Sequence, residues 1–127
     1  MRVCSMVCRC WSRALASAAG LRCLVIRSHW AQDGDFDKAI EAARAQGGEV
    51  LIGGNRIDGA GSFVEPTIIR AQNEWEIVQT ETFVPILYLM PFARIEDAIA
   101  MQNDVPQGLS SALFTTDVRS SELFLSA

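Results

Sequence analysis

The sequence predicts an α/β fold in which a parallel β-sheet is flanked by helices. Helix and strand patterns alternate along residues 33–127, in the order helix, strand, strand, strand, helix, strand, helix. The run from Ile86 to Met90 is apolar throughout, which is typical of a parallel strand covered on both faces. A chain of 127 residues is long enough for one domain and short for two.

The first predicted helix begins near Asp35, whose carboxylate can accept hydrogen bonds from the free amides of the first turn. The apolar residues that follow share one helix face: Phe36, Ala39, Ile40 and Ala43. The pair Gly47-Gly48 ends the helix, because glycine suits a left-handed cap. Residues 49–52 then predict a short buried strand, and residues 53–55 a turn.

The middle of the chain is rich in residues that favour strands and turns. Residues 63–69 predict a strand, and Pro66 within them marks a sheet edge or a kink, because proline cannot donate to a ladder. Residues 73–79 can form one or two helical turns. Residues 85–92 predict the fully buried strand that contains the apolar run.

Two further elements are predicted toward the end of the chain. A helix of about two and a half turns covers residues 95–101, and the segment 103–106 stops it with a proline. Residues 111–115 predict another short strand.

A last helix begins at Val118, capped by Thr116 or Asp117. The chain ends within it at residues 123–127, while apolar side chains are still to be buried. This ending suggests a chain cut from something longer.

Composition divides the chain near residue 33. Residues 1–32 contain five arginines, no acid and all four cysteines, whereas the remainder holds six basic residues and all 15 acids. The formal net charge of -4 argues against a nucleic-acid partner. No apolar run approaches the length of about 18 residues that a membrane helix needs.

The basic segment of residues 1–32 is expected to lack a packed core. Its composition fits a mitochondrial transit peptide, although a frame change or a gene-fragment origin also explains the abrupt switch. The expected location is therefore the cytoplasm, or the mitochondrion if this segment is a transit peptide.

The cysteines of the first segment do not predict a metal site. Cys4, Cys8 and Cys10 have no later Cys or His pair to complete four ligands. His29 is the single histidine and has no neighbouring acid in sequence, so it favours a solvated or capping role over that of a general base.

The most informative stretch surrounds Glu81 and Phe83. In an extended segment, residues two apart point to the same face. The pair could therefore present a carboxylate acceptor and a flat ring to one ligand. The plainer alternative is a surface acid beside a core aromatic ring.

Four ordered motifs in residues 33–127 resemble the aldehyde dehydrogenase superfamily. They are the glycine pairs 47–48 and 53–54, Phe-Val-Glu-Pro-Thr at 63–67, Glu-Thr-Phe-Val-Pro at 81–85, and Gly-Leu-Ser-Ser-Ala-Leu-Phe-Thr at 108–115. The last two are most similar to the antiquitin branch, which oxidises α-aminoadipic semialdehyde among other aldehydes. The resemblance implies that the chain is part of the family's catalytic domain.

The resemblance also implies roles for individual residues. Glu81 would accept hydrogen bonds from the hydroxyls of the nicotinamide ribose, Phe83 would pack near the nicotinamide, and Pro85 would fix the entry into the next strand. The implied cofactor is NAD or NADP. Val84 departs from the Gly or Ala usual in the family and could crowd the backbone near the cofactor.

The implied reaction is oxidation of an aldehyde to a carboxylic acid by a cysteine nucleophile, with a glutamate-activated water. Residues 19–23 loosely resemble the nucleophile motif and make Cys23 the candidate, although Leu21 stands where the family has Gln and the spacing to Glu81 is short. In an alternative alignment Cys23 is not catalytic.

No segment resembles the dinucleotide-binding half or the general-base motif, so the chain alone is expected not to turn over. The full-length family implies a homo-oligomer, a tetramer. The alternative function is a non-catalytic α/β piece that packs against a partner or binds a nucleotide weakly.

Overall fold

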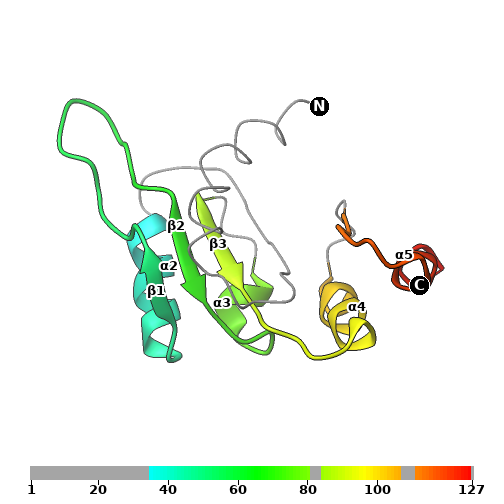
Figure 1. The fold of residues 1–127 in the computed structure, drawn as a ribbon. Helices are drawn as coiled ribbons and strands as arrows, with labels where there is room; N and C mark the ends of the chain where they lie inside the picture. Colours follow the sequence, from blue (N-terminus) through cyan, green and yellow to red (C-terminus); the bar gives the residue numbers. More distant parts are fainter. Residues whose placement is uncertain (1–34, 81–83, 107–110, 127) are drawn as a thin grey trace.

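The computed structural model describes residues 35–80, 84–106 and 111–126, which form a three-stranded sheet and four helices (Figure 1). Cys23, Glu81, Phe83 and the whole basic segment lie outside the described residues. The elements in chain order are α2 (Asp35–Ala45), β1 (Glu49–Ile52), β2 (Thr67–Arg70), α3 (Glu76–Gln79), β3 (Ile86–Leu89), α4 (Ile95–Asn103) and α5 (Val118–Leu125).

The sheet is mixed, with β2 between β1 and β3. Strands β2 and β3 are parallel, as the sequence predicts, and Thr67 lies opposite Ile86. The prediction of a parallel sheet is wrong for β1, which runs antiparallel to β2. The reason lies in the connections: a loop that reverses the chain joins β1 to β2, whereas a crossover through α3 returns the chain for the parallel pair.

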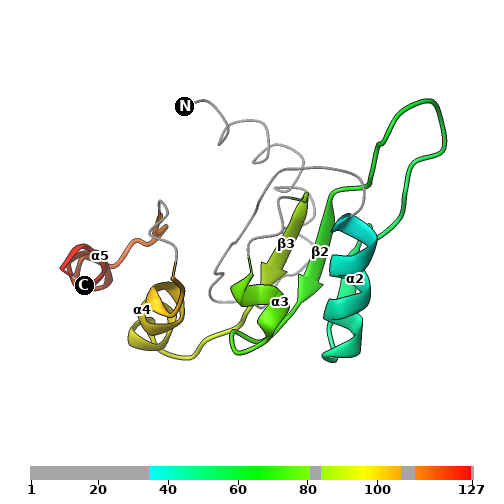
Figure 2. The same cartoon turned by 180° about the vertical axis from the view of Figure 1, so that it is seen from behind.

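Helices α2 and α3 cover the same face of the sheet (Figure 2). The predicted apolar face of α2 is buried, with Phe36 and Ala39 each 1% exposed. From the sheet, Ile69, Ile86 and Tyr88 join the same cluster. The periodicity of α2 therefore identified the packed side of this layer correctly.

Apolar and polar residues do not alternate along β3, because the side chains on both faces of this strand are buried. Ile86 and Tyr88 belong to the cluster beneath α2, whereas Leu87 and Leu89 alternate with them along the strand. All four residues are buried, so both faces of β3 are covered. The sequence prediction of a fully buried strand is confirmed.

Helices α4 and α5 lie beyond the β3 side of the sheet, in both views of the fold (Figures 1 and 2). The last helix begins at Val118, and the side chain of Asp117 caps it by accepting the Ser120 amide at 2.9 Å. Hydrogen bonds from Ser120 hold the pKa of the Asp117 carboxyl below its ordinary value. The choice between Thr116 and Asp117 as the cap is settled in favour of Asp117.

The strand predicted at residues 111–115 is wrong. Those residues have no regular structure, and the ring of Phe114 is 92% exposed. A β-rich sequence forms a strand only where a neighbour pairs with it and a surface covers it, and the described part of the chain gives residues 111–115 neither. In the same part of the chain, no helix has the length and apolarity needed to cross a membrane.

Candidate functional site

Residues 84 and 85 lead into β3 at the edge where β2 and β3 both begin. We call this the amino-terminal edge; it comprises residues 53–55, 65–67 and 84–86. Because the two strands are parallel, their first residues meet there, and the amide of Thr67 donates to the carbonyl of Pro85 at 2.9 Å. The described residues Thr80 and Val84 flank the triplet of residues 81–83 on its two sides.

The exit from the triplet is fixed by burial and by backbone hydrogen bonds. Val84 is 1% exposed and belongs to the cluster beneath α2. The amide of Ile86 donates to the Val84 carbonyl at 2.7 Å, a tight turn that leads directly into the strand. The side chain that departs from the family pattern, Val84, therefore packs into the core.

Thr67 is the centre of the amino-terminal edge and is completely buried. Its hydroxyl accepts a hydrogen bond from the amide of Gly54 at 2.8 Å and donates one to the carbonyl of Glu65 at 2.9 Å. A buried hydroxyl with both partners is favourable, whereas an unpaired one is not. Thr67 thus joins the loop after β1 to the starts of β2 and β3.

The turn of residues 53–55 requires glycine for a steric reason. Gly53 has a φ of +73°, and a Cβ at this position would lie 2.4 Å from the carbonyl oxygen of Pro66. Beside it, Asn55 donates its side-chain amide to the Glu65 carboxylate at 2.8 Å. Gly53 therefore allows the backbone of this turn to pack closely against Pro66 at this edge.

The entry to the triplet is held by a group that we call the amide clamp: Asn73, Gln79 and Asp104. The side-chain amide of Gln79 donates to the backbone carbonyl of Asn73 at 2.7 Å. The side-chain amide of Asn73, a residue 4% exposed, donates to the Asp104 carboxylate at 2.8 Å. Gln79 is the last residue of α3 and lies two positions before Glu81.

Sequence reasoning missed the amide clamp. The sequence places Asp104 in the segment that stops α4, and Asp104 lies 31 positions after Asn73. No local pattern links a helix-ending acid to an amide that far away.

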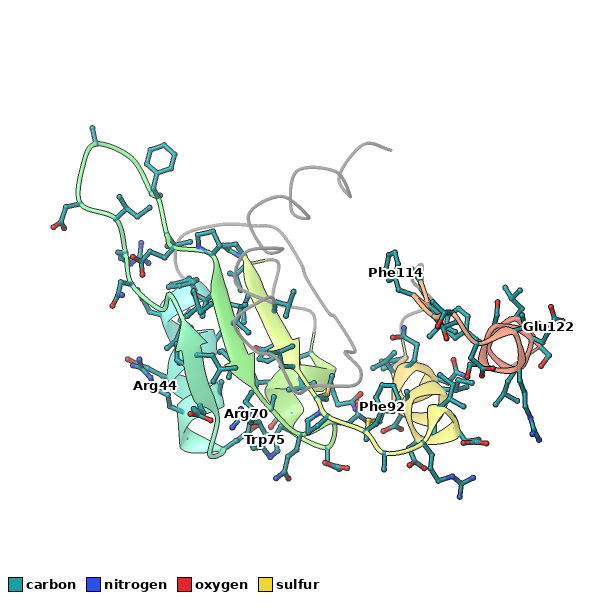
Figure 3. The ribbon with its side chains drawn as sticks, in the orientation of Figure 1. Arg44, Arg70, Trp75, Phe92, Phe114 and Glu122 are labelled. Carbon is teal, nitrogen blue, oxygen red and sulfur yellow. The ribbon has the colours of Figure 1, made fainter. Side chains whose placement is uncertain are left out.

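A hollow of about 410 Å³ lies at the opposite, carboxyl-terminal end of β2 and β3. Its lining includes Met90, together with Arg70 and Trp75, which are labelled in Figure 3. Arg70 pairs with the Glu49 carboxylate at 2.8 Å, so its charge is already matched. Asn73 of the amide clamp also lines this hollow.

The hydroxyl oxygen of Tyr88 is buried and has no hydrogen-bond partner among the described residues. Burial raises the pKa of this phenol to about 12.

Within residues 35–80, 84–106 and 111–126, no three acidic, His or Cys side chains gather to hold a metal ion.

The fold is a piece of an α/β domain with a mixed three-stranded sheet, and comparison with known proteins identifies its family. The family model described as "Aldehyde dehydrogenase family" matches residues 28–127. The chain therefore belongs to the aldehyde dehydrogenase family, as the sequence resemblance predicts.

Curated relatives lie in the branch that the motifs indicate. Over 81 residues the chain is 49% identical to aldehyde dehydrogenase family 7 member A1 of Brassica napus, with 64% of this chain and 16% of that protein covered. It is 46% identical over 84 residues to α-aminoadipic semialdehyde dehydrogenase of Bos taurus, with coverage of 65% and 16%. The chain thus spans about a sixth of the length of these relatives.

Solved structures of the family share the fold. Lactaldehyde dehydrogenase from Escherichia coli gives a TM-score of 0.69 at 29% identity, over 72% of this chain and 20% of that one. The P. syringae indole-3-acetaldehyde dehydrogenase, solved in complex with NAD+, gives 0.69 at 33% identity, over 72% and 19%. These matches confirm that the fold is part of the aldehyde dehydrogenase domain.

Proposed function

We propose that this chain supplies the part of an aldehyde dehydrogenase that holds the nicotinamide ribose of NAD(P)+. Glu81 accepts hydrogen bonds from the ribose hydroxyls, and Phe83 packs beside the nicotinamide ring. The activity served is oxidation of an aldehyde to a carboxylic acid, with a semialdehyde such as α-aminoadipic semialdehyde as the substrate class. When bound, the cofactor supplies the oxidising chemistry of this reaction.

The observation that carries the proposal is the fixed geometry on both sides of residues 81–83. Val84 and Pro85 are anchored by the core and by the Thr67 amide on one side. On the other side, the amide of Thr80 donates to the Glu76 carbonyl at 2.9 Å. A three-residue segment between two fixed ends is limited in where it can place a carboxylate, and such restriction lowers the entropic cost of binding.

The chemistry of the two side chains fits the proposed group. An ionised carboxylate is an acceptor only, with room for the two vicinal hydroxyls of a ribose. Val84 does not oppose this role, because its side chain is buried in the core cluster and is 1% exposed. The buried side chain of Val84 therefore gives no reason to expect that it crowds the proposed cofactor.

Calorimetric titration of the 127-residue chain with NAD+ tests the proposal. Replacing Glu81 by Gln should weaken binding by about 1–2 kcal/mol, the scale of a charge-assisted hydrogen bond. The matched control is Glu122→Gln, which makes the same charge change on exposed α5 (Figure 3). Equal affinities for the native chain and the Glu81 variant would reject the proposed role.

The alternative function is a non-catalytic α/β piece that packs against a partner or binds a nucleotide weakly. We expect the chain alone to produce no NADH from a semialdehyde and NAD+, because no residues resembling the dinucleotide-binding half are present. Steady, protein-dependent NADH formation would contradict this expectation.

Cys23 remains the candidate nucleophile of the proposed activity. A nucleophilic thiol reacts as its thiolate and shows a depressed pKa. Alkylation of the four cysteines, followed by peptide mapping, should show Cys23 reacting faster than Cys4 at neutral pH. Equal rates would remove Cys23 from the proposed mechanism.

The location and assembly of the protein are also proposals. Residues 1–32 fused to a reporter should direct it to mitochondria if they act as a transit peptide, whereas uniform cytosolic signal supports the cytoplasmic location. For the full-length family we propose a homo-oligomer, a tetramer, which sedimentation of a full-length relative would test.

A further inference from the structure

We propose that Asp58 is a site of spontaneous covalent modification, where the chain converts to isoaspartate through a cyclic imide formed with Gly59. The site lies in the loop that joins β1 to β2. We call residues 55–65 of this loop the arm, and residues 58–61 its tip. The arm projects away from the sheet in both views of the fold (Figures 1 and 2). The inference is independent of the proposed role of the chain in binding NAD(P)+.

The reaction needs only the groups of the dipeptide itself and water. The amide nitrogen of Gly59 attacks the side-chain carboxyl carbon of Asp58 while that carboxyl is protonated. A C–N bond forms, a C–O bond of the carboxyl breaks, and the hydroxyl leaves as water together with the amide proton. Water then adds to one of the two carbonyls of the five-membered ring. Addition at the main-chain carbonyl gives isoaspartate, and addition at the other carbonyl restores aspartate.

Glycine after the aspartate makes this attack sterically possible. The attacking nitrogen must approach the preceding side chain, and a Cβ on its own residue hinders that approach. Gly59 has no Cβ, and its φ of +149° is a conformation that other residues rarely adopt. A Cβ added there would meet no atom within 4 Å, so no neighbouring group packs on this side of the backbone.

Both reacting groups are free of other interactions among the described residues. Asp58 is exposed, and its carboxylate has no hydrogen bond or ion pair with any of those residues. The amide of Gly59 likewise donates to none of them. The backbone hydrogen bond that closes the tip lies just outside it, from the amide of Ile57 to the carbonyl of Phe63 at 2.9 Å. The tip is therefore able to adopt the conformation that ring closure requires.

Asp58 differs in these respects from the other aspartates that the structure describes. Among them, it alone is followed by glycine. Asp97 is also exposed, but it lies in α4, where the amide of the next residue, Ala98, donates to the carbonyl of Arg94 at 3.4 Å. An amide held in a helical hydrogen bond is not available to attack the neighbouring carboxyl. Asp97 therefore provides an internal comparison within the same chain.

The base of the arm is held by contacts that the modification leaves in place. Arg56 forms an ion pair of 2.8 Å with the Asp37 carboxylate of α2, and it pairs with Val64 across the arm in an isolated antiparallel bridge. Isoaspartate lengthens the main chain by one methylene group, at Asp58 alone. Loop tips tolerate such insertions, so we expect the sheet to keep its stability after the modification.

Peptide mapping of the intact 127-residue chain tests the proposal. The chain is incubated at physiological temperature and neutral pH, sampled over time and digested with trypsin. Cleavage after Arg56 and Arg70 releases residues 57–70, in which Asp58 is the single aspartate. We expect a second form of this peptide with unchanged mass and with resistance to a protease that cleaves before aspartate. A form lighter by one water should precede it, and Asp97 should stay unmodified over the same period.

Two variants test the mechanism. Asp58→Glu keeps the carboxylate but must close a six-membered ring, and Gly59→Ala adds the hindering Cβ. Each should slow the modification by roughly tenfold or more. Asp58→Glu leaves Gly59 unchanged, so its result does not depend on backbone strain at that position. An undiminished rate in Asp58→Glu would overturn the proposed reaction.

Comparison with the unfolded chain tests the part played by the structure. The rate at Asp58 in the folded chain should lie within roughly tenfold of the rate in concentrated urea. A folded-state rate further below that value, or no modification at all, would show that the fold protects Asp58 and would overturn the inference. Chains with and without isoaspartate should unfold at the same urea concentration, and a lower midpoint for the modified chain would overturn its confinement to the tip.

Discussion

The amide of Gly54 donates a hydrogen bond of 2.8 Å to the buried hydroxyl of Thr67, thirteen residues further along the chain. This contact ties the loop after β1 to the first residue of β2. Because the amide of Thr67 also binds the Pro85 carbonyl, one residue connects the starts of both parallel strands. The hydroxyl therefore matters for the shape of the whole amino-terminal edge.

Replacing Thr67 by Val should destabilise the chain by about 1–3 kcal/mol, because it leaves a buried amide without its acceptor while keeping the side-chain volume. Thr67→Ser keeps the hydroxyl and should lose only about 1 kcal/mol for the missing methyl group. Urea unfolding of both variants measures the difference. A serine variant that is less stable than the valine variant would contradict the assigned role.

Gly53→Ala should destabilise the chain by about 2 kcal/mol or more, since a Cβ there meets the Pro66 carbonyl at 2.4 Å in a positive-φ conformation. Gly59→Ala is the control, because Gly59 also has a positive φ but has no atom within 4 Å of an added Cβ. Thermal unfolding should rank the two variants in that order. Equal losses would show that backbone strain, and not the close approach, sets the effect.

Tyr88→Phe should leave the free energy of unfolding unchanged or raise it by up to about 1 kcal/mol, because it removes a buried hydroxyl. Urea unfolding near neutral pH measures this. A loss of 1 kcal/mol or more would show that the hydroxyl has a partner outside the described residues.

The same residue predicts a pH dependence at the alkaline end. The pKa of Tyr88 is about 12 in the folded chain, above its ordinary value of 10.0. As the pH rises, the unfolded chain therefore loses this proton before the folded chain does. The contribution of the protonated phenol to the free energy of unfolding is complete below pH 10 and is lost as the pH rises toward 12. The chain has one tyrosine, so phenolate absorbance reports this group alone, and Tyr88→Phe should remove its share of the alkaline loss of stability.

Ile69→Ala should destabilise the chain by about 2–5 kcal/mol, because Ile69 is fully buried in the central strand and its removal leaves a cavity. Ile57→Ala is the matched control, since Ile57 is 50% exposed, and should change stability by about 0.5 kcal/mol or less. Denaturant unfolding of the pair measures the contrast. Similar small effects would place Ile69 outside the cooperative core.

Local patterns predicted much of the fold. The spacing of Phe36 and Ala39 located the buried face of α2, and the continuous apolar run located β3, because both depend on which side chains are covered. The direction of β1 was not predictable in this way, since antiparallel pairing depends on how a loop reverses the chain. The strand expected around Phe114 failed because pairing partners are supplied by tertiary structure.

For the candidate site, the sequence identified the motif but not its support. Glu81 and Phe83 were selected by residue type, spacing and family resemblance, and they stay predictions because they lie outside the described residues. The sequence places Thr67 in a predicted strand and in the motif at 63–67, but it does not reveal that Thr67 is the hydrogen-bonding centre of the edge. Asp104 reaches Asn73 across 31 residues, a separation at which local sequence carries no information.

All eight residues of α5 are described, and none of them is buried. A helix with an intact cap but no share of the core adds little to the cooperative unfolding of the sheet. Its amides should therefore exchange with solvent by local opening, at a free energy well below that of global unfolding. In a stability measurement, the chain would then behave as a cooperative sheet layer with a last helix whose opening is nearly independent of it.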